Sequence, residues 1–404
     1  MPRIVGIELF ELDLPFRHAF RHAAAARTAS ESLFLRCLSD RGQIGYGEAL
    51  PRAYVTGETR DGAFDLLAQR ILPRLLGTGF DSLEELEDFL ARCDGKAPEA
   101  WIDSRTPQTA AWCAVDLCLL DTFGRAFGTE LGRRAPVGAG AAASDAWPGA
   151  LRYSLVLSGD LRRRQLATLL AARLYGIRDV KVKLMPDGNS VADVRFVRRA
   201  LGRRARIRVD ANMSWSYDQA RRMAPLLGQY GVESVEQPLP ATDLDGLARL
   251  TAAGVPVIAD ESFHDAVSLE RLIAARACTG VNVRIAKCGG LVASLARARR
   301  AQAAGLAIQV GCQVGETSQL SAAQMILVRV LGPGVSHLEG CYGERLLAVD
   351  PVRPPLQFGR GGRAPATPAG PGFGTEVDMS IVRRHCGRRA SLGSVMSEGA
   401  RGRA

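Results

Sequence analysis

The sequence lacks the long apolar run that a membrane helix needs. It contains no stretch of about 18 consecutive apolar residues, so we expect no membrane-spanning segment. The N-terminal stretch MPRIVGIELFELDLPF alternates like a strand and has no basic start followed by an apolar region, which argues against a signal peptide. A cytoplasmic location is the resulting expectation.

The chain also lacks the cysteine spacing of a disulfide framework or a zinc site. Its nine cysteines include no CxxC pair and are scattered, several of them in apolar runs. Free buried thiols in a reducing compartment explain this usage better than disulfides. A zinc site would need cysteines and histidines grouped more closely.

Aromatic residues are few, at 6% of the chain, and they do not interleave with the arginines that give a net charge of +10. The arginines are spread over several predicted helices, so we interpret them as a solvated surface and expect no nucleic-acid partner. The positive field favours a small anionic substrate.

Composition is otherwise globular, with 404 residues of which 47% are hydrophobic. Strand-like runs over 1–60 and helical periodicity over 60–130 predict an α+β unit at 1–135. Within it, 16–27 is interpreted as a polar, alanine-rich loop. The Ala- and Gly-rich stretch 136–150 is interpreted as a linker.

From residue 151 to 345, short β-like runs alternate with helical runs, which predicts a barrel of parallel strands. A Pro/Gly-rich segment, 346–385, follows. The last stretch, 386–404, has too little apolar content to pack and is expected to be a disordered tail.

Charged residues recur at the ends of five of these β-like runs, 24 to 27 residues apart. That spacing is close to one strand–helix unit of a barrel, in which all strands end at the same face. Residues distant in sequence should therefore converge there: Lys183, Asp210, Glu236, Asp260 and Lys287.

Asp210, Glu236 and Asp260 offer oxygen ligands only, which suits Mg²⁺, with Mn²⁺ as an alternative, and argues against zinc. The simpler interpretation, that each carboxylate caps a helix or pairs with an arginine, explains one such residue better than three in series. Lys183 and Lys287 flank the series on opposite sides. Lys181 lies on the same side of its strand as Lys183, although a KxK pair can also mark a solvated edge.

A metal with lysine bases indicates removal of the proton α to a carboxylate, through an enediolate that the metal stabilises. Two opposed lysines favour racemisation or epimerisation. The same intermediate also allows cycloisomerisation or a dehydrating elimination. A non-catalytic binding protein on the same fold is a more distant alternative.

The motifs KVKL, VDAN, VEQP, ADES and KCGG, in this order, resemble the muconate-lactonizing-enzyme subgroup of the enolase superfamily. The resemblance implies a (β/α)7β barrel with an α+β capping domain built from both chain ends. It also implies that the protein assembles as a dimer or an octamer. It implies Mg²⁺ on the three carboxylates, Lys183 and Lys287 as the acid/base pair, Lys181 tuning Lys183, and Asn212 near the ligands.

By the same resemblance, specificity would lie in the cap loops 16–27 and 51–59 and at the last strand ends. The implied substrate is a small carboxylate, such as an amino-acid or dipeptide derivative. Dipeptide epimerases of the subgroup carry an Asp-x-Asp pair where this chain has His337-Leu338-Glu339, which argues against that specificity. The candidate substrate contacts are His18, Arg27, Tyr54, Asn212, Glu316 and Glu339, and the two glutamates are equally compatible with a structural role.

Overall fold

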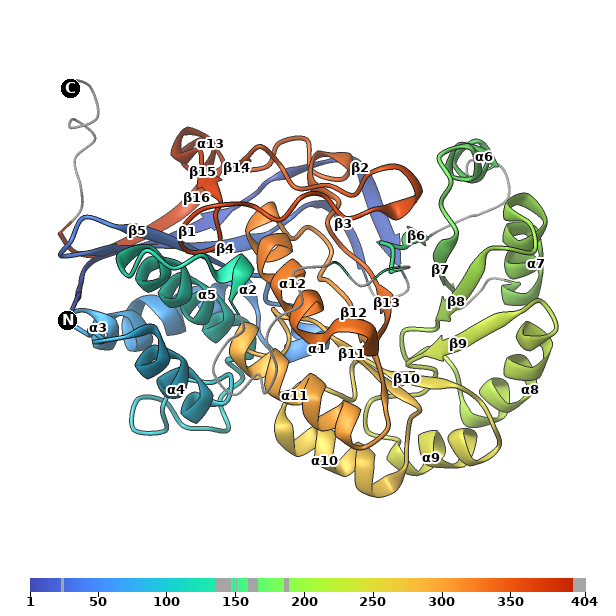
Figure 1. The fold of residues 1–404 in the computed structure, drawn as a ribbon. Coiled ribbons are helices and arrows are strands. Elements are labelled where there is room, and N and C mark those ends of the chain that lie inside the picture. The colour runs from blue at the N-terminus through green and yellow to red at the C-terminus, as the bar shows by residue number, and fades with distance from the viewer. Residues whose placement is uncertain are drawn as a thin grey trace.

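The computed structural model describes residues 1–22, 25–134, 147, 149, 151–158, 166–184 and 189–394. It consists of a barrel and an α+β cap, which lie on opposite sides of Figure 1. None of the helices in these ranges is long and apolar enough to cross a membrane.

Eight parallel strands pair in chain order to form the barrel, with seven helices between them. The ring closes where the Ser154 N–H donates to the Leu338 carbonyl and Tyr153 forms a parallel bridge to Leu338. The (β/α)7β fold with a separate cap is therefore confirmed. The elements are β6 (Leu155–Leu157), α6 (Leu166–Leu174), β7 (Asp179–Lys183), α7 (Ser190–Leu201), β8 (Arg206–Asp210), α8 (Tyr217–Gly228), β9 (Val232–Glu236), α9 (Leu244–Ala252), β10 (Val257–Ala259), α10 (Ala266–Ala275), β11 (Gly280–Val283), α11 (Leu291–Ala303), β12 (Ala307–Val310), α12 (Ser318–Leu331) and β13 (Val335–Leu338).

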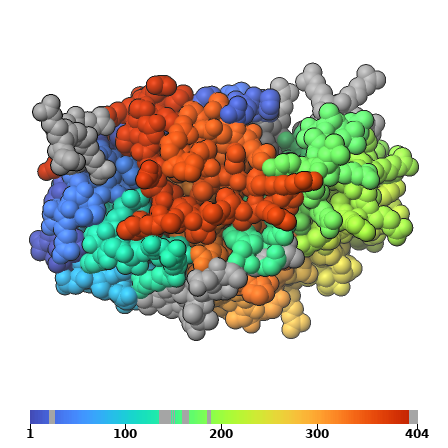
Figure 2. Space-filling model, turned by 45° about the horizontal axis from the view of Figure 1, so that its top comes forward, coloured from blue at the N-terminus to red at the C-terminus, as the bar shows by residue number. Residues whose placement is uncertain are grey.

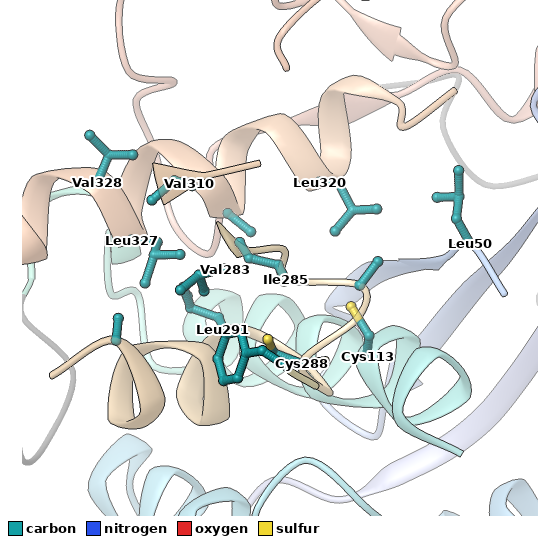
Figure 3. Close-up of a cluster of buried hydrophobic side chains, with 14 of the residues drawn as sticks. Leu50, Cys113, Val283, Ile285, Cys288, Leu291, Val310, Leu320, Leu327 and Val328 are labelled. Atoms are coloured by element: carbon teal, nitrogen blue, oxygen red, sulfur yellow. The ribbon is translucent and has the colours of Figure 1, made fainter. Parts of the chain in front are cut away.

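Alternation along β11 separates an outer apolar layer from an inner polar one. Figure 3 shows Val283 of β11 and Val310 of β12 among the apolar side chains of α11 and α12, which cover the outside of the barrel. Asn282 lies between Val281 and Val283 of β11 and points inward, where its Nδ2 donates to Glu236 at 3.0 Å. The barrel interior near the site is thus polar and fully buried.

The cap is built on an antiparallel sheet of order β16-β1-β4-β5. Helix α5 packs so closely on β5 that a Cβ on Gly47 would lie 1.9 Å from the Ala114 carbonyl oxygen, which explains the glycine. The elements are β1 (Ile4–Leu12), β2 (Pro15–His22), β3 (Ala25–Ala29), β4 (Ser32–Ser39), β5 (Ile44–Ala49), α1 (Ala53–Thr56), α2 (Arg60–Leu66), the π-helix Leu67–Ile71, α3 (Leu72–Leu75), α4 (Leu83–Cys93), α5 (Thr109–Ala126), β14 (Val352–Arg353), β15 (Glu376–Val377), α13 (Met379–Arg384) and β16 (Cys386–Gly393).

Two segments differ from the sequence-based expectation. The expected disordered tail at 386–404 is wrong for 386–393, which form edge strand β16 against β1; residues 395–404 lie outside the described part of the chain. An edge strand needs backbone partners more than apolar side chains, so composition did not reveal it. The expected loop at 16–27 is largely a β2–β3 hairpin. The linker expected at 136–150 lies outside the described residues apart from Trp147 and Gly149.

Buried acids join the cap and the C-terminal segment to the start of helix α12. Glu48 of β5 accepts bonds from the Thr317 N–H and hydroxyl, and Asp350 accepts bonds from the Ser318 N–H and hydroxyl, as suits carboxylates at a helix N-terminus. Figure 2 shows the red C-terminal segment spread between the blue-to-teal N-terminal residues and the green start of the barrel. These contacts fix the cap over the barrel mouth.

Candidate active site

The three predicted metal ligands lie together at the C-terminal ends of neighbouring strands. Asp210 pairs in register with Glu236, and Glu236 with Ile258, two residues before Asp260. All three carboxylates are at most 1% exposed. The structure therefore brings this part of the predicted site together, as parallel strands that end at one face require.

Four cationic side chains surround these carboxylates. Lys181 Nζ lies 3.1 Å from Glu236 Oε1 and 3.6 Å from Asp210 Oδ2, and Lys183 Nζ lies 3.0 Å from Asp210 Oδ2. On the other side, Arg284 contacts Asp260 and lies 3.5 Å from Glu236 Oε1. Lys287 Nζ is 2.8 Å from Asp260 Oδ1.

Among the described residues, no three acidic, histidine or cysteine side chains already form a metal cage, because each of these carboxylates is turned toward a cation. The donor set nevertheless fits a hard divalent ion, since it is made only of carboxylates on adjacent strands. Burial raises the pKa of Asp210, and the charges of Glu236 and Asp260 add to this against the opposing effect of Lys183. Lys181 and Arg284 hold the pKa of Glu236 well below its usual value, although burial opposes them. A bound cation would relieve the repulsion at Asp210.

A cavity of about 290 Å³ opens above this cluster, between barrel and cap. Its polar floor contains Lys181, Lys183 and Arg284, and its wall contains apolar Leu155 and Val156 of β6. Five of the predicted substrate contacts are among its lining residues: His18, Tyr54, Asn212, Glu316 and Glu339. Arg27 is not among them; its guanidinium pairs with Glu31.

The two predicted glutamates differ in their availability to a substrate. Glu339 is held by Lys181 at 2.6 Å and by Arg208 at 2.9 Å, so its charge is already balanced. Glu316 accepts a bond from the Gln313 N–H at 2.6 Å, and burial raises its pKa to about 8. In the described structure, Glu339 is therefore a structural partner of the floor, whereas Glu316 remains a candidate contact.

Lys287 is placed differently from the expectation that it faces the substrate. It is fully buried and is not among the described residues that line the cavity. Its Nζ donates to Asp260 Oδ1, the Asp260 carbonyl and the Asn282 carbonyl, each at 2.8 Å.

Arg284 and Glu261 are among the lining residues that were not identified from the sequence. Arg284 follows directly on the alternation of VNVR, which points Asn282 and Arg284 to the same inner side. The alternation of inward and outward side chains along this strand could have identified Arg284. The regular 24- to 27-residue spacing led to Lys287 instead. Glu261 follows Asp260, and burial, together with the charge of Asp260, raises its pKa to about 8.

Comparison with known proteins agrees with this architecture. Residues 164–381 match the family model described as enolase C-terminal domain-like. The chain is 30% identical to an L-Lys-D/L-Arg epimerase of Methylococcus capsulatus, covering 83% of this chain and 88% of that protein. It is 27% identical to muconate cycloisomerase 1 of Rhodococcus opacus, covering 94% and 97%.

Solved structures share the fold. A dipeptide epimerase of Cytophaga hutchinsonii, complexed with Mg and the dipeptide D-Ala-L-Val, superimposes with a TM-score of 0.83 at 23% identity, over 97% of this chain and all of that one. An N-succinyl Arg/Lys racemase of Bacillus cereus superimposes with a TM-score of 0.82 at 22% identity, over 96% of this chain and all of that one.

Proposed function

The chain belongs to the enolase C-terminal domain-like family and is an isomerase of the enolase superfamily, and we propose that it removes the proton next to the carboxylate of a small substrate with Lys183 as the base. One observation carries this proposal. Lys183 lines the cavity and places its Nζ 3.0 Å from Asp210, beside the three-carboxylate cluster.

We propose that Asp210, Glu236 and Asp260 hold Mg²⁺, with Mn²⁺ as a substitute. A divalent ion bound there would ligate the substrate carboxylate and stabilise the negative charge that develops as the α-proton leaves. The oxygen-only donor set on three adjacent strands supports this assignment.

The remaining steps belong to the chain's own side chains. Asn212 Oδ1 accepts a bond from Lys183 Nζ at 3.0 Å and so orients the amine. Lys181 supports the floor by bonding Glu236 and Glu339. The apolar wall at Leu155 and Val156 limits water near the reacting carbon.

Two isomerisations follow from this half-reaction. Racemisation or epimerisation of an amino-acid or dipeptide derivative is supported by the names of relatives such as the L-Lys-D/L-Arg epimerase. Cycloisomerisation is supported by the match to a muconate cycloisomerase and by the position of Lys287, which leaves one lysine of the predicted pair at the cavity. A homo-oligomeric state and a cytoplasmic location stay predictions.

Hydrogen exchange tests the shared half-reaction. The protein is incubated with Mg²⁺ in deuterium oxide with both enantiomers of N-succinyl-arginine, L-Ala-Glu epimers, L-Lys-Arg epimers and muconolactone, and α-deuterium is followed by NMR. We expect exchange in at least one compound, its loss on chelation with EDTA, and its loss in Lys183→Met. If compounds bind but none exchanges, the proposal is wrong.

A further inference from the structure

We propose that Arg284, and not Lys287, faces the substrate opposite Lys183, so that protons move on one face of the substrate only. This inference rests on the proposed function and specifies its stereochemistry. It assigns Arg284 as a binding residue for the substrate carboxylate and Lys287 as a positioning residue beneath Asp260.

The strand order places Arg284 opposite Lys183. Lys183 ends β7, Asp210 ends β8, Glu236 ends β9, Asp260 follows β10 and Arg284 follows β11. Five successive strands of an eight-strand ring span half its circumference. The two cationic side chains therefore approach the cavity floor from opposite sides, with the three carboxylates between them.

Strand alternation determines which side chain of this segment reaches the cavity. Val283 packs outward, so Arg284 points inward like Asn282. Arg284 is 7% exposed, lines the cavity and donates to Gln313 Oε1 at 3.2 Å. Lys287 comes three residues later, in the turn before α11.

The Lys287 ammonium has no hydrogen left for a substrate. Its three protons match its three acceptors, all at 2.8 Å, and the Phe263 ring lies 5.0 Å away on another side. To act on a substrate, Lys287 would have to break these bonds and leave a fully buried position. Its contacts instead hold the backbone and carboxylate of Asp260 in place.

Arg284 is equipped to bind an anion. Among the described residues, its Nε–H finds no acceptor, although the atom is buried. A guanidinium carries only donors and matches the geometry of a carboxylate. A two-base racemase needs a second proton carrier on the side of the cavity opposite Lys183. On that side, this chain offers the hydrogen-bond donors of Arg284.

The reaction that follows is balanced with Lys183 alone. The C–H bond α to the carboxylate breaks, Lys183 accepts the proton when its amine is in the unprotonated form, and the electron pair moves toward the carboxylate. In a lactone, this electron pair then forms a C=C bond between the α- and β-carbons. The bond between the β-carbon and the ring oxygen breaks, and that oxygen leaves as part of a carboxylate. The reverse reaction closes the ring and returns the proton from Lys183, and neither direction needs an oxidant or another reactant.

Lysine labelling tests the placement without turnover. The folded full-length protein is treated with formaldehyde and cyanoborohydride, with and without muconolactone, and Lys183 and Lys287 are quantified by peptide mass spectrometry. We expect methylation of Lys183, slowed by the lactone, and protection of Lys287 until the protein is denatured. Methylation of Lys287 at a similar rate, slowed by the lactone, would overturn the inference.

Stereospecific exchange tests the consequence. We expect the wild-type protein to exchange only one enantiomer of any substrate pair, and Lys287→Met to retain that preference at whatever rate it shows. Arg284→Lys places an amine opposite Lys183 and is expected to add exchange of the other enantiomer. Wild-type exchange of both enantiomers, with one lost in Lys287→Met, contradicts the inference but leaves the proposed function standing. Exchange of no compound counts against the proposed function, and the labelling result still decides the placement of the lysines.

Discussion

Replacing Lys287 with methionine tests whether this residue is part of the protein's framework. Methionine keeps an unbranched stem of similar size, so the change removes an ammonium without opening a large cavity. The lost contacts are the bonds to Asp260 Oδ1 and to the carbonyls of Asp260 and Asn282. We expect a marked loss of stability even without substrate or metal.

The magnitude follows from burial. Lys287 and Asp260 are both 0% exposed, and removing one partner of a buried ion pair costs about 3–5 kcal/mol, because the other charge stays buried. In a domain of this size, 1 kcal/mol shifts the melting temperature by about 2 °C. We therefore expect Lys287→Met to melt about 6–10 °C lower than the wild-type protein.

Scanning calorimetry in EDTA measures this shift without a contribution from bound metal. Lys96→Met is the matched control, because Lys96 pairs with Asp265 at 3.2 Å but is 30% exposed. Such an exposed pair contributes about 0–1 kcal/mol, so the control should melt within about 2 °C of wild type. If Lys287→Met also melts within that range, the assignment of Lys287 to the framework is refuted.

Other expected results concern the base, the chain end and a buried acid. Lys183→Met should lower kcat by about 10²–10⁴, as for loss of a general base; equal rates in steady-state assays would contradict its role. A chain stopped after Ser394 should melt like the full chain, whereas a stop after His385 removes β16 and should cost about 2–4 kcal/mol at about 0.5–1.5 kcal/mol per hydrogen bond; equal melting of the two chains would contradict the pairing with β1. Burial raises the pKa of Glu58 to about 8, so its contribution to stability is complete below pH 4.5 and falls as the pH rises to 8. The stability difference between wild type and Glu58→Gln should decline over that window in urea titrations, and a constant difference would contradict the shift.

Spacing predicted well which three carboxylates lie side by side, because barrel geometry repeats. Asp210, Glu236 and Asp260 each end or follow a strand, so equal steps along the chain become neighbouring positions in space. The same spacing argument was weaker for Lys287, the last residue of the series. A step of 27 residues reaches Lys287 in a turn, whereas the alternation of the strand reaches Arg284.

Segments held by backbone bonds were harder to predict. The β2–β3 hairpin and β16 have few apolar side chains, so neither shows the alternation that reveals a half-buried strand. β16 depends on a partner, β1, that is almost the whole chain away. No local pattern in the sequence encodes such a pairing.

The position of β1 also has a consequence for the order of folding. This first strand lies between β4 and β16, so one of its two neighbours is synthesised long after it. The C-terminal segment that buries Asp350 against α12 is likewise made late. All barrel strands are made before β16, so the cap that carries His18 and Tyr54 gains its edge strand only after the barrel strands exist. The reaction chamber, which needs both cap and barrel, is therefore completed after the barrel strands.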